Sequence, residues 1–90
     1  MMELENTVKM MLSKDYKDRL IAEYRQVGIR YLKLDEMVRK YQNDELDFTP
    51  KTPLKILQGQ VGAMMAYMAI LEHSAALEGV DLTKPLDGEE

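Results

Sequence analysis

Residues 53–79 form a stretch that is apolar or small on nearly every side of a helical wheel. No charged residue occurs between positions 56 and 71. A helix with one apolar face covers one partner, so a helix that is apolar nearly all round needs several. The pattern predicts a helix over about 53–78, bounded by Thr52 as its N-cap and by Gly79 after its last turn.

The residues of this predicted helix fall into three neighbouring stripes. The first is a heptad seam, which suits one helical partner along its whole length. The second holds large apolar residues and a tyrosine, and the third holds small residues that let another helix approach closely. In order, the stripes are Leu54, Leu57, Val61, Met64, Met68, Leu71 and Ala75; Ile56, Gln60, Ala63, Tyr67, Ile70, Ser74 and Leu77; and Gly59, Gly62, Ala66, Ala69, His73 and Ala76.

A second heptad seam predicts another long helix over about 14–42, with Ser13 as its N-cap. Ile21 and Ile29 lie off this seam, so the helix is expected to make a second, weaker contact. Gly28 inside it costs about 1 kcal/mol relative to Ala and indicates a kink or a close approach. The seam residues are Leu20, Tyr24, Val27, Tyr31, Leu34, Val38 and Tyr41.

The remaining segments are short. Residues 1–12 form either a short amphipathic helix or a frayed terminus. Residues 43–52 are a polar connection, and the tail 80–90 carries apolar residues that are expected to dock on the two long helices. These residues are Val80, Leu82 and Leu86.

These elements predict an all-α fold in one domain, residues 1–90: an antiparallel hairpin of two long helices. A hairpin gives the second helix only one neighbour, which leaves a large apolar surface exposed. Such a surface usually marks an interface, so the sequence predicts a homo-oligomer, a dimer or higher, built on the second helix. The sequence leaves open which stripe faces the first helix and which faces another protomer.

Composition narrows the function classes. The 90 residues include no Cys, and the net charge of −4 argues against nonspecific DNA binding. The uncharged run is shorter than the roughly 20 residues that cross a bilayer, and the N-terminus lacks the pattern of a secretory leader. We therefore expect a cytoplasmic protein that binds neither DNA nor a membrane.

Aromatic and basic residues are mixed along the first long helix, and this mixture is the strongest candidate for chemistry. Arg offers planar donors to phosphate, and Tyr offers a stacking face, so together they suit a ligand with a nucleobase and phosphates. The competing interpretation makes the tyrosines seam residues and the arginines solvated flanks. The candidate ligand-binding residues on both helices are Tyr24, Arg25, Arg30, Tyr31, Lys33, Tyr67 and His73.

No pattern in the chain indicates catalysis. His73 is the only histidine, and without a second His or any Cys a metal site is unsupported. Its competing interpretation is a packing or interface residue. Glu72 and Glu78 are six positions apart on a helix and point in different directions, so they do not form a carboxylate pair. We expect no enzyme activity, no cofactor and no catalytic residue.

The chain resembles a family of small helical phage proteins described by relation to a crAss-like phage product. The resemblance covers about residues 14–82 and rests on Asp15-Tyr16-Lys17, Glu23-Tyr24, Pro53-Leu54 and the ending Glu78-Gly79-Val80. It implies a helical hairpin and a phage origin. More loosely, the chain is similar to phage anti-defence sponges, which are short oligomeric hairpins that sequester cyclic nucleotide signals between protomers.

The leading hypothesis is therefore a phage-encoded, non-catalytic oligomer in the cytoplasm of the bacterial host. It would sequester an immune signal of the cyclic dinucleotide or cyclic ADP-ribose type. The alternative is a protein-interaction module, an adaptor or inhibitor of a host protein, that acts through its helical surface.

Overall fold

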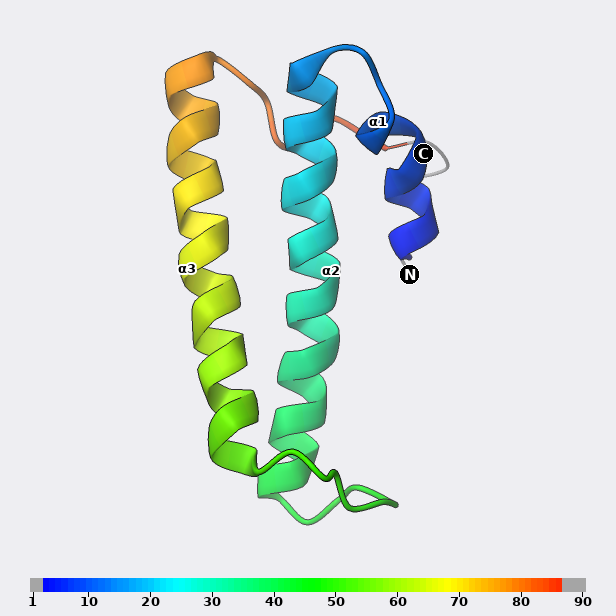
Figure 1. Ribbon diagram of the computed structural model, residues 1–90, viewed down its shortest axis with the longest axis vertical. Helices are drawn as coiled ribbons and strands as arrows, with labels where there is room; N and C mark the ends of the chain where they lie inside the picture. Colours follow the sequence, from blue (N-terminus) through cyan, green and yellow to red (C-terminus); the bar gives the residue numbers. More distant parts are fainter. Residues whose placement is uncertain (1–2, 87–90) are drawn as a thin grey trace.

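Two long antiparallel helices dominate the computed structural model, which describes residues 3–86 (Figure 1). A 3-10 helix, Leu4–Thr7, runs into the short α1, Val8–Met11; α2 spans Tyr16–Gln42 and α3 spans Leu54–Glu78. Over the described part of the chain there is no strand, so the predicted all-α hairpin is confirmed.

The N-terminus of α2 differs from the prediction by two residues. Asp15, and not Ser13, is the N-cap, and its carboxylate accepts a hydrogen bond of 3.0 Å from the Lys17 backbone N–H. Ser13 instead supports the preceding turn, because its hydroxyl accepts from the Asp15 N–H at 3.1 Å and donates to the Asp18 carboxylate at 2.9 Å. Both side chains therefore help to start α2, at different positions.

The ends of α3 follow from its terminal residues. The helix begins at Leu54, and Pro53 is its N-cap in an extended conformation, so the predicted cap at Thr52 is wrong by one residue. At the other end, Gly79 adopts a left-handed φ of 68°, and the Val80 N–H donates to the Ala75 carbonyl at 2.9 Å. This is the six-to-one bond of a Schellman ending, which confirms the role predicted for Gly79.

The first stripe of α3 is the one that packs on α2. Leu57, Leu71 and Ala75 are buried, and the other members of that stripe are partly buried. On α2, Val27 and Val38 are buried beneath them. The structure therefore settles a question that the sequence left open: the first stripe faces α2 within the hairpin.

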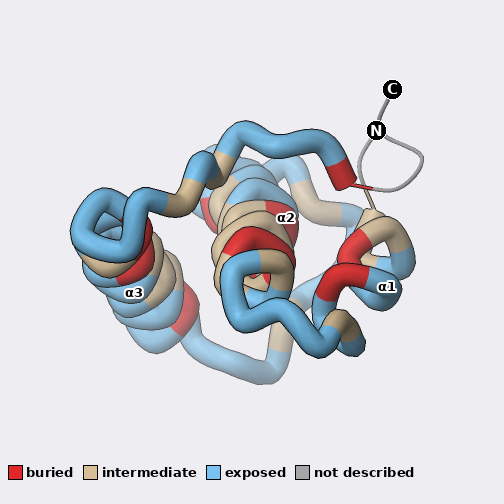
Figure 2. Tube along the Cα trace, turned by 90° about the horizontal axis from the view of Figure 1, so that it is seen from above, coloured by how far each residue is buried: buried red, intermediate tan, exposed pale blue. Residues whose placement is uncertain are grey.

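The opposite face of α2 is covered by the N-terminal helices and by the tail segment 80–86. The tail crosses α2 and reaches α1, so that a second small core forms on the side away from α3 (Figures 1 and 2). This core explains why Ile21 lies off the α2 seam. Residues 1–2 and 87–90 of the predicted terminal segments lie outside the described residues. The core residues are Met10, Ile21, Ala22 and Leu86, with Val80 and Leu82 packed against them.

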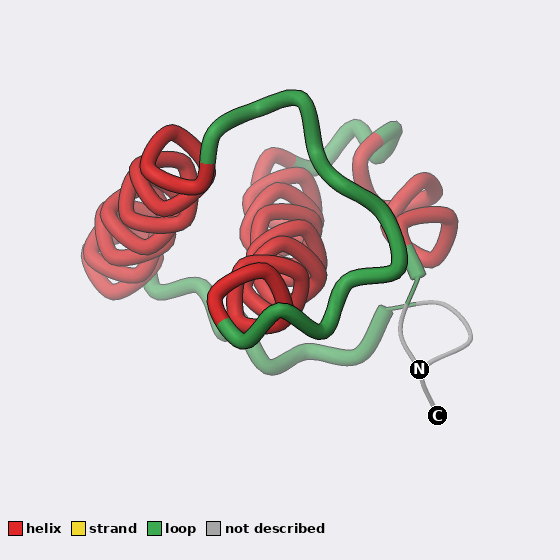
Figure 3. The backbone as a smooth tube through the Cα atoms, turned by 90° about the horizontal axis from the view of Figure 1, so that it is seen from below, coloured by secondary structure: helices red, strands yellow, loops and turns green. Residues whose placement is uncertain are grey.

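The connection between the long helices is a wide loop and not a tight turn (Figure 3). Asp44 has a left-handed φ of 59°, and the next residue, Glu45, donates its N–H to the Lys40 carbonyl at 2.8 Å. The end of α2 thus resembles a Schellman motif with Asp in the place of the usual Gly. Leu46 is partly buried in this loop, while Phe48 is exposed.

Candidate functional site

Most of α3 is uncovered. Its buried residues face α2 only, whereas α2 has buried residues on two sides (Figure 2). Large apolar side chains lie on the free surface of α3: Ile56 is 61% exposed, Ile70 65% and Leu77 78%. An apolar surface of this kind marks an interaction site.

By length and composition alone, α3 could cross a membrane, and only 11% of its most apolar window is buried. One such helix is weak evidence, because a core helix passes the same test. Here α3 packs along α2, a helix with many charged residues, and tyrosine–carboxylate hydrogen bonds join the two helices. That partner is unsuited to a hydrocarbon environment.

Three tyrosine–glutamate hydrogen bonds tie α2 to α3. Tyr24 donates its hydroxyl to Glu72 at 2.5 Å, and Tyr16 donates to Glu78 at 3.2 Å. The third bond joins the Tyr67 hydroxyl to the Glu23 carboxylate. In each case the hydrogen bond to the carboxylate is the main cause that raises the pKa of the tyrosine above its ordinary value. The hydroxyls of Tyr24 and Tyr67 are thus engaged inside the hairpin.

The predicted ligand-binding residues occupy four different parts of one chain. Tyr24 and Tyr31 are seven positions apart and share one edge of α2. Arg30 is seven positions from Glu23 and lies on the opposite edge of α2. Tyr67 of α3 bonds to Glu23 at that same edge of the hairpin. One chain alone does not gather these groups on one surface.

The remaining candidates lie further away. Arg25 donates to the Lys84 carbonyl at 3.4 Å beneath the tail, and Lys33 forms an ion pair of 2.9 Å with Glu3. Both are therefore on the outer face of α2. His73 is exposed on the face of α3 that is turned away from α2.

Arg30 is the basic candidate with the most freedom to meet a ligand. Within residues 3–86 its guanidinium has no hydrogen-bond or ion-pair partner, and the side chain is exposed. The Tyr31 hydroxyl likewise accepts and donates no hydrogen bond in the described region, and its ring is partly buried. Ligand contact remains a prediction for all seven residues.

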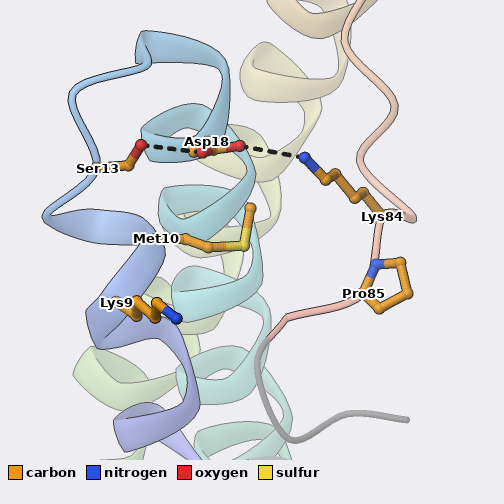
Figure 4. Close-up of a pocket in the computed structure, with 6 residues that line it drawn as sticks. All are labelled: Lys9, Met10, Ser13, Asp18, Lys84 and Pro85. Atoms are coloured by element: carbon orange, nitrogen blue, oxygen red, sulfur yellow. Dashed lines mark hydrogen bonds and ion pairs between the residues drawn. The ribbon is translucent and has the colours of Figure 1, made fainter.

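A cavity of about 340 Å³ lies where α1, the first turn of α2 and the tail meet (Figure 4). Asp18 lines the cavity between two polar partners: it accepts from Ser13 at 2.9 Å and pairs with Lys84 at 3.4 Å. These contacts, the Ser13 hydrogen bond first, lower the pKa of Asp18 against an opposing effect of burial. The polar groups satisfy one another, so the cavity wall ties the tail to α2. Its lining residues are Lys9, Met10, Ser13, Asp18, Lys84 and Pro85.

A smaller hollow of about 230 Å³ lies against the outer face of α2, near the connecting loop. It places the exposed ring of Phe48 near Lys33 and Lys40, each of which already pairs with a glutamate. The sequence did not single out Phe48, because nothing in the local pattern shows that the loop folds back toward Lys33. The hollow combines an aromatic ring with basic groups.

Comparison with known proteins gives one match. A family model described as Sequestin matches residues 14–73, which is 60 of the 90 residues. The match covers α2, the connecting loop and most of α3, and leaves out α1 and the tail. No curated protein and no solved structure matches the chain.

Proposed function

The chain belongs to the Sequestin family, and we propose that it is a phage-encoded, non-catalytic oligomer that sequesters a nucleotide-derived immune signal in the cytoplasm of the bacterial host. The family name suggests a sequestering binding protein. The family match carries the proposal, because it spans both α2, with the aromatic and basic residues, and the uncovered helix α3.

The ligand class follows from the side chains that border the free surface. Stacking of a base on an aromatic ring contributes about 1–3 kcal/mol, and Arg donates to phosphate in a planar, often bidentate geometry. Tyr67 is held to α2 by its hydroxyl, which leaves its ring partly exposed near the edge that carries Arg30. A cyclic dinucleotide or a cyclic ADP-ribose isomer offers both bases and phosphates.

Oligomer formation supports the same function. In a single chain the candidate residues lie on separate surfaces, so a complete pocket requires a second protomer. The exposed apolar face of α3 provides the surface on which that protomer would pack. Sequestration needs tight binding and no chemical step, which agrees with the absence of a catalytic pattern in the sequence.

Isothermal titration with a panel of cyclic dinucleotides and cyclic ADP-ribose isomers tests the proposal. We expect heat with at least one of them, recovery of that compound unchanged after the protein is denatured, and at least a tenfold weaker affinity for Arg30→Ala. Arg39→Ala is the matched control, because Arg39 is an exposed arginine on α2 that pairs with Asp35. No heat with any compound contradicts the proposal, and a chemically altered ligand would indicate an enzyme.

The alternative is a protein-interaction module that uses the same apolar surface of α3 to bind a host protein. The uncovered residues of α3 favour it as much as they favour self-association. Light scattering separates the two functions: a monomer that captures one host protein in stoichiometric amount supports the alternative, and an oligomer that binds a nucleotide supports sequestration.

A further inference from the structure

Besides the seam that faces α2, α3 carries another heptad seam on its uncovered side, here called the outer seam. Ile56, Ala63, Ile70 and Leu77 recur every seven residues, and three residues between them complete the repeat. Every member is exposed. The seam consists of Ile56, Gly59, Ala63, Ala66, Ile70, His73 and Leu77.

Gly59 has no role inside the hairpin. A Cβ atom added there would meet nothing within 4 Å, so none of the residues that the structure describes requires a glycine at this position. A glycine inside a helix costs about 1 kcal/mol relative to alanine. No described residue uses the space at Gly59, so the helix backbone there is open to a partner, as it is at Gly62.

We propose that the outer seam binds the outer seam of a second copy in an antiparallel pair, with Leu77 packed over Gly59 of the partner subunit. In an antiparallel helix pair this one contact fixes which residues meet in all the remaining layers, because the helical repeat sets their spacing. Ile70 then packs on Ala66 of the partner subunit, and His73 packs on Ala63 of the partner subunit. The two-fold axis repeats each contact, so each of these three layers joins one large side chain to one small residue. Ile56 lies beyond the last of them, because α3 of the partner ends at position 78.

The alternative arrangements fit less well. A parallel pair places Gly59 on Gly59 and Ile70 on Ile70, which leaves a void in one layer and crowding in the other. An antiparallel pair shifted by one heptad places Ile56 on His73 and Ala63 on Ala66, again large on large and small on small. Because interiors pack at nearly crystalline density, both patterns are disfavoured.

Charge favours the same orientation. The start of α3 carries Lys55, whereas its last turn and the following residues carry Glu78 and Asp81. In the proposed antiparallel register Lys55 lies at the acidic end of the partner helix, about one helical turn beyond Glu78 of the partner subunit, and the contact occurs twice. A parallel pair would bring Glu78 near Glu78 instead, and like charges at short range oppose association.

This inference rests on the proposed function and deepens it, because the partner completes the candidate site. Within one chain Tyr67 and His73 are six residues apart and point to different sides of α3. In the pair, His73 of the partner subunit lies on Ala63, one helical turn from Tyr67. The two polar rings, one from each copy, then border the same end of a pocket.

Cysteine cross-linking tests the register, since the natural chain has no cysteine. Gly59→Cys and Leu77→Cys proteins are mixed in equal amounts and oxidised mildly. We expect a cross-linked heterodimer from the mixture and only background from either protein alone. In the proposed pair, positions 59 and 59 of the two copies are separated by about 27 Å, far beyond the roughly 7 Å between Cα atoms that a disulfide spans.

The other outcomes overturn the proposal. Cross-linking of Gly59→Cys with itself would show a parallel pair, and preferential cross-linking of Gly59→Cys with Ile70→Cys would show the shifted register. Monomer in every mixture would show that α3 does not self-associate. Co-sedimentation of the natural chain with phosphatidylcholine and phosphatidylglycerol vesicles, together with monomer in their absence, would assign the surface to a membrane.

A bulky residue in the seam gives a second, independent test. Gly59→Leu should raise the dissociation constant of the dimer at least tenfold in analytical ultracentrifugation, because Leu77 of the partner subunit loses its space. Gln58→Leu is the matched control on the adjacent exposed position and should change the constant less than threefold. Equal effects, or no effect of Gly59→Leu while its helical circular dichroism is intact, contradict the register.

Failure here is distinguishable from failure of the proposed function. If no mixture cross-links as expected but titration detects a bound cyclic nucleotide, the register is wrong and sequestration stands. If the Gly59→Cys and Leu77→Cys mixture cross-links and no compound binds, the pair stands and the proposed ligand class is wrong.

Discussion

The two long helices differ in an unexpected direction: the more polar one is the more buried. In α2, which has many charged residues, five residues are buried, whereas in the far more apolar α3 only three are. Composition predicts the opposite order, because burial of apolar surface contributes about 25 cal/mol per Å². The difference shows that position in the fold, and not composition, decides which helix is covered.

The cause is the path of the chain. The N-terminal helices and the tail segment 80–86 lie over the outer face of α2, where they share a core around Leu86 (Figure 1). Nothing in the described residues covers the free surface of α3. Its apolar surface therefore remains available to a partner, which is the physical basis of the proposed oligomer.

Weakening the packing of the tail on α2 should lower the free energy of unfolding more than any other change proposed here. Leu86 is 2% exposed, so Leu86→Ala should lower the free energy of unfolding by about 3 kcal/mol, within the 2–5 kcal/mol range for buried leucines. Urea denaturation measures it. Leu12→Ala is the control, because Leu12 is 78% exposed, and it should cost less than about 0.5 kcal/mol. Equal losses would show that the tail does not dock.

Two adjacent residues separate the covered and uncovered sides of α3. Leu71 is 7% exposed, so Leu71→Ala should cost about 2–3 kcal/mol of unfolding free energy, as other buried leucines do. Ile70→Ala, on the free surface, should cost less than about 0.7 kcal/mol at concentrations too low for association, a value that reflects helix propensity and surface position. A large loss for dilute Ile70→Ala would mean that Ile70 is buried within one chain.

A pair of glycines, one on each helix, sharpens the comparison further. A Cβ at Gly28 would lie 3.4 Å from the Met68 methyl group, an ordinary contact with a flexible side chain, so Gly28→Ala should stabilise the chain by about 0.5–1 kcal/mol. Gly59→Ala should give a similar gain in dilute solution. Thermal unfolding at several concentrations checks both. A loss of stability in Gly28→Ala would mean that α2 and α3 pack too tightly there for a methyl group.

The smallest effect concerns the hydrogen bond between Tyr24 and Glu72. This bond raises the pKa of Tyr24 in the folded state, so its contribution is present below about pH 10 and is lost as the pH rises through the raised value. Tyr24→Phe should cost about 0.5 kcal/mol at pH 7, the lower end for a net hydrogen bond because the group is partly exposed. The difference from the natural chain should shrink above pH 10 in denaturation curves. Tyr31→Phe is the control, and a pH-independent difference for Tyr24→Phe would rule out this linkage.

Much of the fold could be predicted from local pattern. The alternation of three and four along Leu57, Val61 and Leu71 identified α3 and one stripe suited to a helical partner, because heptad spacing fixes a direction on a helix. Which of the three stripes meets α2 was decided by the structure. Gly79 marked the end of α3 for a similarly local reason. The caps were harder: Ser13, Asp15 and Thr52 all suit a helix start, and only the backbone path decides which one is used.

The candidate site could be predicted far less well. Arg25 and Lys33 were attractive as basic residues on a helix that also carries tyrosines, yet their side chains contact the tail and the N-terminal segment. The cavity around Asp18 was missed altogether, because Asp18 and Lys84 are 66 positions apart and no local periodicity relates them. Contacts between polar residues that are distant in the chain leave no periodic pattern in the sequence, so hydrophobic periodicity could not predict them.

The sequence by itself determined two amphipathic seams, their helices and an apolar surface too large for one hairpin to cover, because side-chain periodicity and helix geometry are local properties. Only the tertiary structure decided where the two termini go. They cover α2 and leave α3 bare, since the tail turns at Gly79 and finds its apolar contacts with Met10 and Ile21 on the far side. That choice depends on packing between segments distant in the chain.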